Sequence, residues 1–183
     1  MESIVQAKRV LEIFKEMSQI PRESGNEKGI SDYIVNFAKN LGLEVHQDDQ
    51  FNVVIKKPAS PGYENRPSII LQGHIDMVCV RDHDSNHDFS KDPIANIIEG
   101  EWMHADHTTL GADNGMGGAM MLAILEDDSQ QHGPMQLLFT TNEETGMDGA
   151  FAIKEGQVSG DYLLNLDTEV EHDFTVSLSL IHI

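Results

Sequence analysis

The stretch SIILQGHIDMV, residues 68–78, is the most informative for the fold of this chain. It begins with a continuous apolar run, which is typical of a central strand covered on both faces. The run leads directly into Gly73, His74 and Asp76, so polar side chains stand where the predicted strand ends. Open α/β sheets bind their ligands beyond the carboxyl ends of the strands. The stretch therefore predicts a central strand with ligand-type side chains at its carboxyl end.

Two helices are predicted before the sheet. The first has apolar residues at helical spacing, namely Val10, Ile13, Phe14 and Met17, and Pro21 ends it. The segment SGNE, residues 24–27, has the serine-to-glutamate spacing of a capping box. A second apolar stripe follows it up to Gly42 and comprises Ile30, Ile34, Phe37 and Leu41.

The rest of the chain alternates between predicted strands and helices. Short strands are expected around Val45 and Val54, and a hairpin over residues 93–105 that turns at Glu99–Gly100. Residues 114–127 predict a helix whose apolar face comprises Met116, Ala119, Met120, Ala123 and Ile124. Residues 135–141 and 161–167 predict two more buried strands, separated by a helical or irregular stretch over 148–158. This order predicts an α/β fold of three layers, with a mostly parallel central sheet flanked by helices.

Composition restricts the partners of the chain. Its 183 residues suit one globular domain, and 31 acidic against 12 basic residues give a net charge of −19, which argues against nucleic acid or an anionic membrane as partner. The N-terminus mixes charged and apolar residues, unlike a secretory signal, so we expect a cytoplasmic protein. A single cysteine, Cys79, excludes an internal disulfide framework and a thiolate metal cluster.

Ligand-type side chains follow three predicted strands and precede one helix. They are His74 after the first stretch, Glu143 and Glu144 in TTNEETGMDG, Asp167 after DYLLNL, and Asp113 in TTLGADNGMGG. Taken singly, each has an ordinary explanation as a structural histidine, a helix cap or a solvated turn. Together they would gather in one crevice, where a pair of divalent metal ions would offset the repulsion between the adjacent glutamates.

Side-chain direction separates the roles of these residues. Residues two apart on an extended segment point the same way, so Asp76 is placed to orient or polarise the His74 imidazole or the metal assembly. Adjacent residues point differently, so one of Glu143 and Glu144 would bind metal and the other would accept a proton from metal-bound water. Imidazole and carboxylates without cysteine suit catalytic Zn²⁺, Co²⁺ or Mn²⁺.

Other catalytic motifs are missing from the sequence. It has no His-Glu-x-x-His helix, no phosphate-binding loop with a Gly-Lys-Ser/Thr end and no Gly-x-Ser-x-Gly elbow. An EF-hand starting at Asp106 is excluded because Leu110 stands where an oxygen ligand is required.

Four segments together resemble one family: GHIDMV, TTLGADNGMGGAMMLAIL, LLFTTNEETGMDGA and YLLNLDTE. They are similar to the aminoacyl-histidine dipeptidases, also called Xaa-His dipeptidase or peptidase D. These belong to the co-catalytic metallopeptidases that include carboxypeptidase G and the aminoacylases. The resemblance implies a zinc-dependent exopeptidase-like fold and hydrolysis of dipeptides with C-terminal histidine, such as carnosine-like substrates, by metal-bound hydroxide.

The resemblance also implies individual roles. His74 and Asp167 would bind one Zn²⁺, Glu144 would bind a second, and Asp113 would bridge the two, with a cis peptide bond to Asn114. Glu143 would be the general base, and Asp76 would stand beside the histidine ligand. The partner would be a small peptide substrate, and the complete enzyme would form a homodimer.

The chain departs from the family pattern in three ways. His107 stands where glycine is expected, the end of the chain reads SLSLIHI, and His182 does not match the motif of the family's further metal-binding histidine. The resemblance thus implies that residues 1–183 are the N-terminal part of the catalytic domain, without the lid and dimerisation domain. Two alternatives remain: a catalytically incompetent metal-binding remnant, or an N-acyl amino acid deacylase of the same fold.

Overall fold

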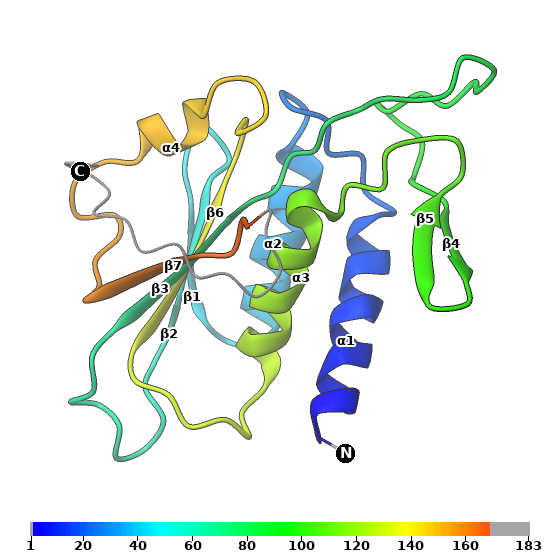
Figure 1. Cartoon of the computed structure of the whole chain (residues 1–183). Helices are drawn as coiled ribbons and strands as arrows, with labels where there is room; N and C mark the ends of the chain where they lie inside the picture. Colours follow the sequence, from blue (N-terminus) through cyan, green and yellow to red (C-terminus); the bar gives the residue numbers. More distant parts are fainter. Residues whose placement is uncertain (1, 169–183) are drawn as a thin grey trace.

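The computed structural model describes residues 2–168 (Figure 1). The segment SLSLIHI at the end of the chain, which contains His182, lies outside these residues. The elements in chain order are α1 (Glu2–Met17), α2 (Lys28–Asn40), β1 (Glu44–Gln47), β2 (Val53–Lys57), β3 (Ile69–His74), β4 (Asn96–Glu99), β5 (Trp102–Ala105), α3 (Ala112–Glu126), β6 (Met135–Thr140), α4 (Asp148–Ala152) and β7 (Tyr162–Asn165).

Five of the strands form one mixed sheet in the order β1-β2-β6-β3-β7. Strands β6, β3 and β7 run parallel, and β3 lies inside the sheet between the other two, as its continuous apolar run predicts. Strands β1 and β2 are antiparallel to their neighbours and lie at one edge. The α/β class is confirmed, and the parallel part of the sheet is the part that carries the ligand-type side chains. The predicted hairpin β4–β5 forms a separate two-stranded sheet.

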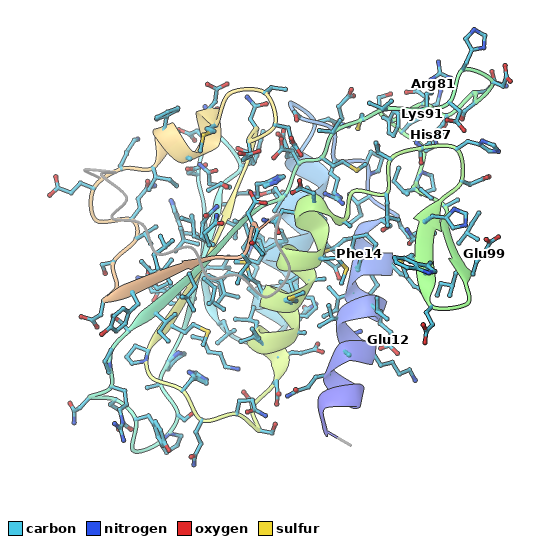
Figure 2. All side chains as sticks on the ribbon, in the orientation of Figure 1. Glu12, Phe14, Arg81, His87, Lys91 and Glu99 are labelled. Carbon is cyan, nitrogen blue, oxygen red and sulfur yellow. The ribbon has the colours of Figure 1, made fainter. Side chains whose placement is uncertain are left out.

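One face of the sheet is covered by α2 and α3, and α1 packs against α3 (Figure 1). The predicted stripe of α1 is confirmed, because Ile13, Phe14 and Met17 are fully buried. Phe14 lies between α1 and α3 (Figure 2) and packs in the same cluster as Leu137 and Phe139 of β6. Burial of such side chains stabilises the fold by about 1.5–3 kcal/mol each, so this face holds the main core.

The opposite face of the sheet has a smaller apolar cluster. Val54, Ile70 and Leu138 are buried there, from β2, β3 and β6, and Ile153 and Val158 pack against them. The segment that follows α4 thus forms the third layer. Because apolar side chains cover both faces of β3 and β6, these two strands lack the alternation of a half-exposed sheet.

The predicted apolar face of α3 is partly wrong: Ala119 is fully buried and Met116 and Ala123 pack against the core, but the other two residues do not. Met120 and Ile124 are 43% and 40% exposed, whereas Met121, Leu122 and Leu125 are buried against the core. Almost every residue of this helix is apolar or glycine, so periodicity cannot select the buried side. The three glycines at 115, 117 and 118, which are buried, mark the face that lies closest to its neighbours.

Strand β7 was predicted to be buried, and this is also wrong. It pairs with β3 at the edge of the sheet, and all four of its residues are exposed in the described part of the chain. Leu163 and Leu164 are 52% and 46% exposed. An apolar run predicts a buried strand, but burial requires other segments to pack against it. Within residues 2–168, no segment buries β7.

Within residues 2–168, no helix combines the length and the apolar character needed to cross a membrane.

Candidate metal centre

The carboxyl ends of the parallel strands bring the predicted residues together. His74 is the last residue of β3 and lies opposite Thr140, the last residue of β6, so Glu143 and Glu144 follow at the same edge. Strand β7 is in register with β3 up to Asn165, which places Asp167 there as well. The predicted convergence of these segments is therefore confirmed.

Carboxylates from three segments approach His74. The Nε2 atom of this imidazole is 3.1 Å from Asp113 Oδ1, 3.8 Å from Asp167 Oδ2 and 3.9 Å from Glu143 Oε2. The imidazole itself is 1% exposed, whereas the Asp113 side chain is 68% exposed. His74 thus forms the floor of the cluster, and the carboxylates form its open rim.

Asp76 holds the other side of the imidazole. Its Oδ1 atom is 3.2 Å from His74 Nδ1, as the His-x-Asp spacing predicts for side chains on the same side. The carboxylate is fully buried and also accepts hydrogen bonds from the backbone N–H groups of Glu143 and Glu144, at 3.1 and 3.2 Å. Ser24 Oγ donates a further bond at 2.7 Å. One buried carboxylate therefore fixes both the imidazole and the loop that carries the two glutamates.

These contacts shift the pKa values of the two buried groups in opposite directions. Burial is the largest single cause and disfavours the charge on each group, but the hydrogen bond between them and the surrounding charges and hydrogen bonds together outweigh it. The pKa of His74 rises to about 9, with the charges of Asp76 and Asp167 contributing. The pKa of Asp76 falls to about 2, with the bond from Ser24 contributing. A protonated His74 therefore offsets part of the negative charge of the carboxylates at neutral pH.

The pKa of Glu144 is raised, first by burial and then by the charge of Asp113. The repulsion between the adjacent carboxylates of Glu143 and Glu144 is only partly offset by the protein itself. The loop of the two glutamates is held by its backbone N–H groups, which donate to Asp76, and by the positive charge on His74. The Glu144 carboxylate is nevertheless surrounded by more negative than positive charge. A cation is the natural complement of that surplus.

The donor atoms fit a divalent metal. Two sets of three residues place one ligand atom each within 4.8 Å of one another: His74, Glu143 and Glu144, and His74, Asp113 and Asp167. A single imidazole nitrogen with carboxylate oxygens is a donor set that suits catalytic zinc and related ions. The second set contains the three residues that the resemblance places around one metal. The first set contains the predicted base Glu143 together with the predicted ligand Glu144.

The start of α3 has an unusual backbone. The peptide bond between Asp113 and Asn114 is cis, as the resemblance implied. Asn114 is buried, and its Nδ2 atom has no hydrogen-bond partner among the described residues. A Cβ atom on Gly117 would overlap the Asn114 side chain and meet the Leu166 carbonyl oxygen at 3.0 Å. Glycine at 117 thus lets the start of α3 approach the segment that carries Asp167.

The predicted capping box at residues 24–27 is wrong. Glu27 precedes α2 but makes no side-chain cap, and Ser24 donates to Asp76 instead. The Glu27 carboxylate is buried and accepts the backbone N–H of Asn142 at 3.0 Å. Both side chains therefore support the site from a distant segment. The spacing of Ser24 and Glu27 predicted hydrogen bonds to the start of α2. The prediction is wrong because the side-chain oxygen atoms of both residues bond to distant parts of the chain instead.

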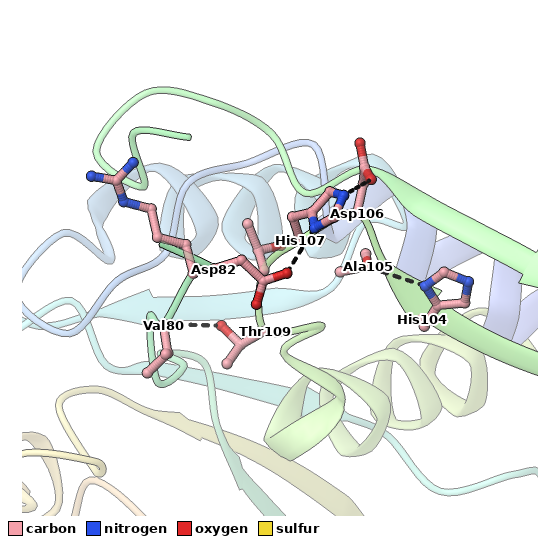
Figure 3. A pocket seen from close by; sticks show the side chains of 9 residues that line it. Val80, Asp82, His104, Ala105, Asp106, His107 and Thr109 are labelled. Atoms are coloured by element: carbon pink, nitrogen blue, oxygen red, sulfur yellow. Dashed lines mark hydrogen bonds and ion pairs between the residues drawn. The ribbon is translucent and has the colours of Figure 1, made fainter. Parts of the chain in front are cut away.

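His107 does not join the cluster. It has a positive φ of 55°, which fits the expectation of glycine at this position. Its Nδ1 atom is 2.7 Å from Asp82 Oδ2 and its Nε2 atom is 3.8 Å from Asp106 (Figure 3). The adjoining cavity of about 480 Å³ is lined by nine residues, none of which is a predicted site residue. The hydrogen bond with Asp82 raises the pKa of His107.

The fold and the site together define a class of protein. It is an α/β chain with a histidine–carboxylate cluster at the carboxyl ends of its parallel strands, and the donor atoms of this cluster are of the type that binds divalent metals. Residues 70–177 match the family model described as peptidase family M20/M25/M40, which covers more than half of the chain. The chain belongs to this family.

Individual relatives agree with this assignment. The chain is 47% identical over 160 residues to the cytosol non-specific dipeptidase of Escherichia coli (strain K12), covering 87% of this chain and 33% of that protein. It superimposes on the crystal structure of aminoacylhistidine dipeptidase from Vibrio alginolyticus with a TM-score of 0.86 and 47% identity, over 89% of this chain and 33% of that one. A tripeptidase from Staphylococcus aureus gives a TM-score of 0.75 and 26% identity, over 89% and 44% of the two chains. The chain thus spans about a third of the length of its more similar relatives.

Proposed function

We propose that this chain is the N-terminal part of the catalytic domain of a metal-dependent dipeptidase. The observation that carries the proposal is the convergence of His74 with the carboxylates of Asp113, Glu143, Glu144 and Asp167 at one edge of the sheet. Family membership supports it. Two Zn²⁺ ions are proposed for the complete site, with Co²⁺ or Mn²⁺ as substitutes.

Each residue has a proposed role. His74, Asp113, Glu144 and Asp167 bind the metal ions, whose charge lowers the pKa of a water molecule and polarises the scissile carbonyl. Glu143 takes the proton of the attacking water and passes it to the leaving amine, as a general base and acid. Its side chain is one-third exposed, so it is open to substrate.

Asp76 is proposed to orient His74 for metal binding. It contacts Nδ1 and so directs Nε2 towards the carboxylates of the rim. A carboxylate behind a histidine ligand fixes both the ring orientation and the tautomer. The same group holds the backbone of Glu143 and Glu144, so it sets the position of the base relative to the ligands.

For the substrate, we propose a dipeptide with C-terminal histidine. One relative is named a non-specific dipeptidase and another an aminoacylhistidine dipeptidase, so a free dipeptide is common to both names. We also propose a cytoplasmic location. Comparing hydrolysis of a Xaa-His dipeptide, another dipeptide and an acetylated amino acid tests the substrate class, and faster cleavage of the acetylated compound would contradict the proposal.

Glu143→Gln in the complete enzyme tests the mechanism. It removes the base while keeping the size of the side chain, so turnover should fall by about 10²–10⁴-fold while bound zinc, measured by atomic absorption, stays unchanged. Glu155→Gln is the matched control, because Glu155 is an exposed glutamate outside the cluster. Near-normal turnover of the Glu143 variant would show that the base is another group.

A further inference from the structure

Arg22 is a buried cation behind the site. It lies between α1 and α2 and is 2% exposed. Burial lowers the pKa of its guanidinium to about 10, so it stays charged at neutral pH. Burying a charge is costly unless its hydrogen bonds are specific. The partners of this guanidinium therefore indicate what it does.

The guanidinium joins the two loops that carry the site. Its Nη1 atom donates to the carbonyl oxygens of Ile75 and Asp76, at 3.2 and 3.1 Å, and its Nη2 atom donates to the carbonyl oxygen of Gly111. The first two residues follow His74 directly, and Gly111 lies two residues before Asp113. The planar guanidinium thus bridges the loop that follows His74 and the loop that precedes Asp113. The Nε2 atom of His74 and the Oδ1 atom of Asp113 are 3.1 Å apart.

Two glycines leave the space that this guanidinium occupies. A Cβ atom on Gly111 would collide with Arg22 Nη2, and one on Gly115 would lie 2.6 Å from the same atom. Gly111 also has a φ of +70°, a conformation that favours glycine. The glycine-rich loop before α3 is therefore shaped around the arginine, which is an observation independent of the hydrogen bonds.

We propose that Arg22 is a positioning residue of the metal centre. By binding three carbonyl oxygens, it fixes the distance between His74 and Asp113 and so preorganises both for the same cation. This proposal rests on the proposed metal-dependent function. Arg22 does not touch the metal or the substrate, and its effect passes through the backbone of the two loops.

Charge and geometry predict opposite results when Arg22 is replaced. Asp76 and Asp113 both interact with its charge, so Arg22 lies close enough to repel a bound cation. By Coulomb's law alone, Arg22→Met should strengthen zinc binding. Loss of positioning should weaken it. Arg22→Lys keeps the charge but replaces the planar fork with one ammonium group, which cannot span both loops in the same geometry.

The test is zinc affinity of the 183-residue chain, measured with a competing chromophoric chelator at a temperature where circular dichroism shows every variant folded. We expect Arg22→Lys and Arg22→Met each to bind Zn²⁺ about 10–100-fold more weakly than wild type, as for other residues that orient ligands. The matched controls are Arg9→Lys and Arg9→Met. Arg9 joins α1 to Glu126 at the far end of α3, so its loss should lower the melting temperature without changing zinc affinity.

A second variant keeps the test decisive if Arg22→Met does not fold. Gly115→Ala retains the arginine but its Cβ would crowd the guanidinium at 2.6 Å and the Phe14 ring at 2.9 Å. It should therefore also weaken zinc binding, and the part of its effect that passes through the guanidinium should not add to that of Arg22→Lys. Wild-type zinc affinity in Arg22→Lys and Gly115→Ala would overturn the positioning role while leaving the metal centre intact. Absence of zinc binding by the wild-type chain would overturn both proposals.

Discussion

The substitution Asp76→Asn should destabilise the metal-free chain strongly. The carboxylate is fully buried, so solvent does not screen its interactions. Burial opposes its charge, yet its hydrogen bonds lower its pKa from 3.8 to about 2. At about 1.36 kcal/mol per pKa unit, this shift corresponds to about 2.5 kcal/mol of stability at neutral pH. Asparagine would also turn one NH₂ group towards a backbone N–H of the glutamate loop, which costs about 1–3 kcal/mol more.

The total expected loss is about 3.5–5.5 kcal/mol, or roughly 7–22 °C in melting temperature for a chain of this size. The loss should depend on pH. The lowered pKa of Asp76 gives stability that is present above pH 3.8 and lost as pH falls through about 2. The raised pKa of His74 gives stability that is complete below pH 6.5 and lost as pH rises through about 9. Both shifts share the His74–Asp76 hydrogen bond, so their energies are not summed. The difference between wild type and variant should therefore be largest between about pH 4 and 6.5.

Urea unfolding in the presence of a chelator, at pH 5.5, 7.5 and 9, measures this difference. The matched control is Asp48→Asn, because Asp48 also accepts two backbone N–H groups but has no histidine partner. The control should lose stability equally at pH 5.5 and 9. A loss for Asp76→Asn that is below about 1 kcal/mol, the worth of one ordinary hydrogen bond, or that is the same at pH 5.5 and 9, would refute the pairing with His74.

Two further predictions concern metal binding and the start of α3. Zinc should raise the melting temperature of the chain near pH 7.5 and do little near pH 5, because protons compete with the metal for His74 and the carboxylates; equal shifts at both pH values would contradict a histidine–carboxylate site. Gly117→Ala should cost about 1–3 kcal/mol by overpacking and should weaken zinc binding, since its Cβ would meet the Asn114 side chain and the Leu166 backbone. Gly118→Ala is the control, because its nearest neighbour is the flexible end of Met17 at 3.1 Å; a milder effect of Gly117→Ala than of Gly118→Ala in both assays would show that the close approach is unimportant.

The sequence predicted the site better than it predicted the packing of individual elements. Strand β3 and its His-x-Asp end could be identified because a continuous apolar run followed by glycine and polar residues is a local pattern. The convergence of the ligand-type side chains could be predicted because the carboxyl ends of parallel strands lie at the same edge of a sheet. The pairing of β3 with β6 and β7 then brought His74, Glu143 and Asp167 to one edge without any further assumption.

The errors arose where local patterns were ambiguous. Helix α3 is apolar on all sides, so only the contacts of its glycines show which face is buried. Ser24 and Glu27 matched a capping motif, but their oxygen atoms are used by Asp76 and by the backbone of Asn142. Arg22 gave no signal at all, because a single arginine after a proline has no recognisable spacing to loops more than fifty residues away. These residues support the site only through tertiary contacts.

Contacts of the loop explain how Glu143 and Glu144 can stand side by side. Their backbone N–H groups are both held by Asp76, their loop is supported by Glu27, and the nearest positive charge is a protonated His74. That proton occupies the same Nε2 region that a cation would use, so proton and metal are alternative occupants of one position. With His74 protonated, the cluster keeps a surplus of negative charge, and a divalent cation would offset more of it than the proton does. We therefore expect cation binding at the proposed site to displace a proton from His74.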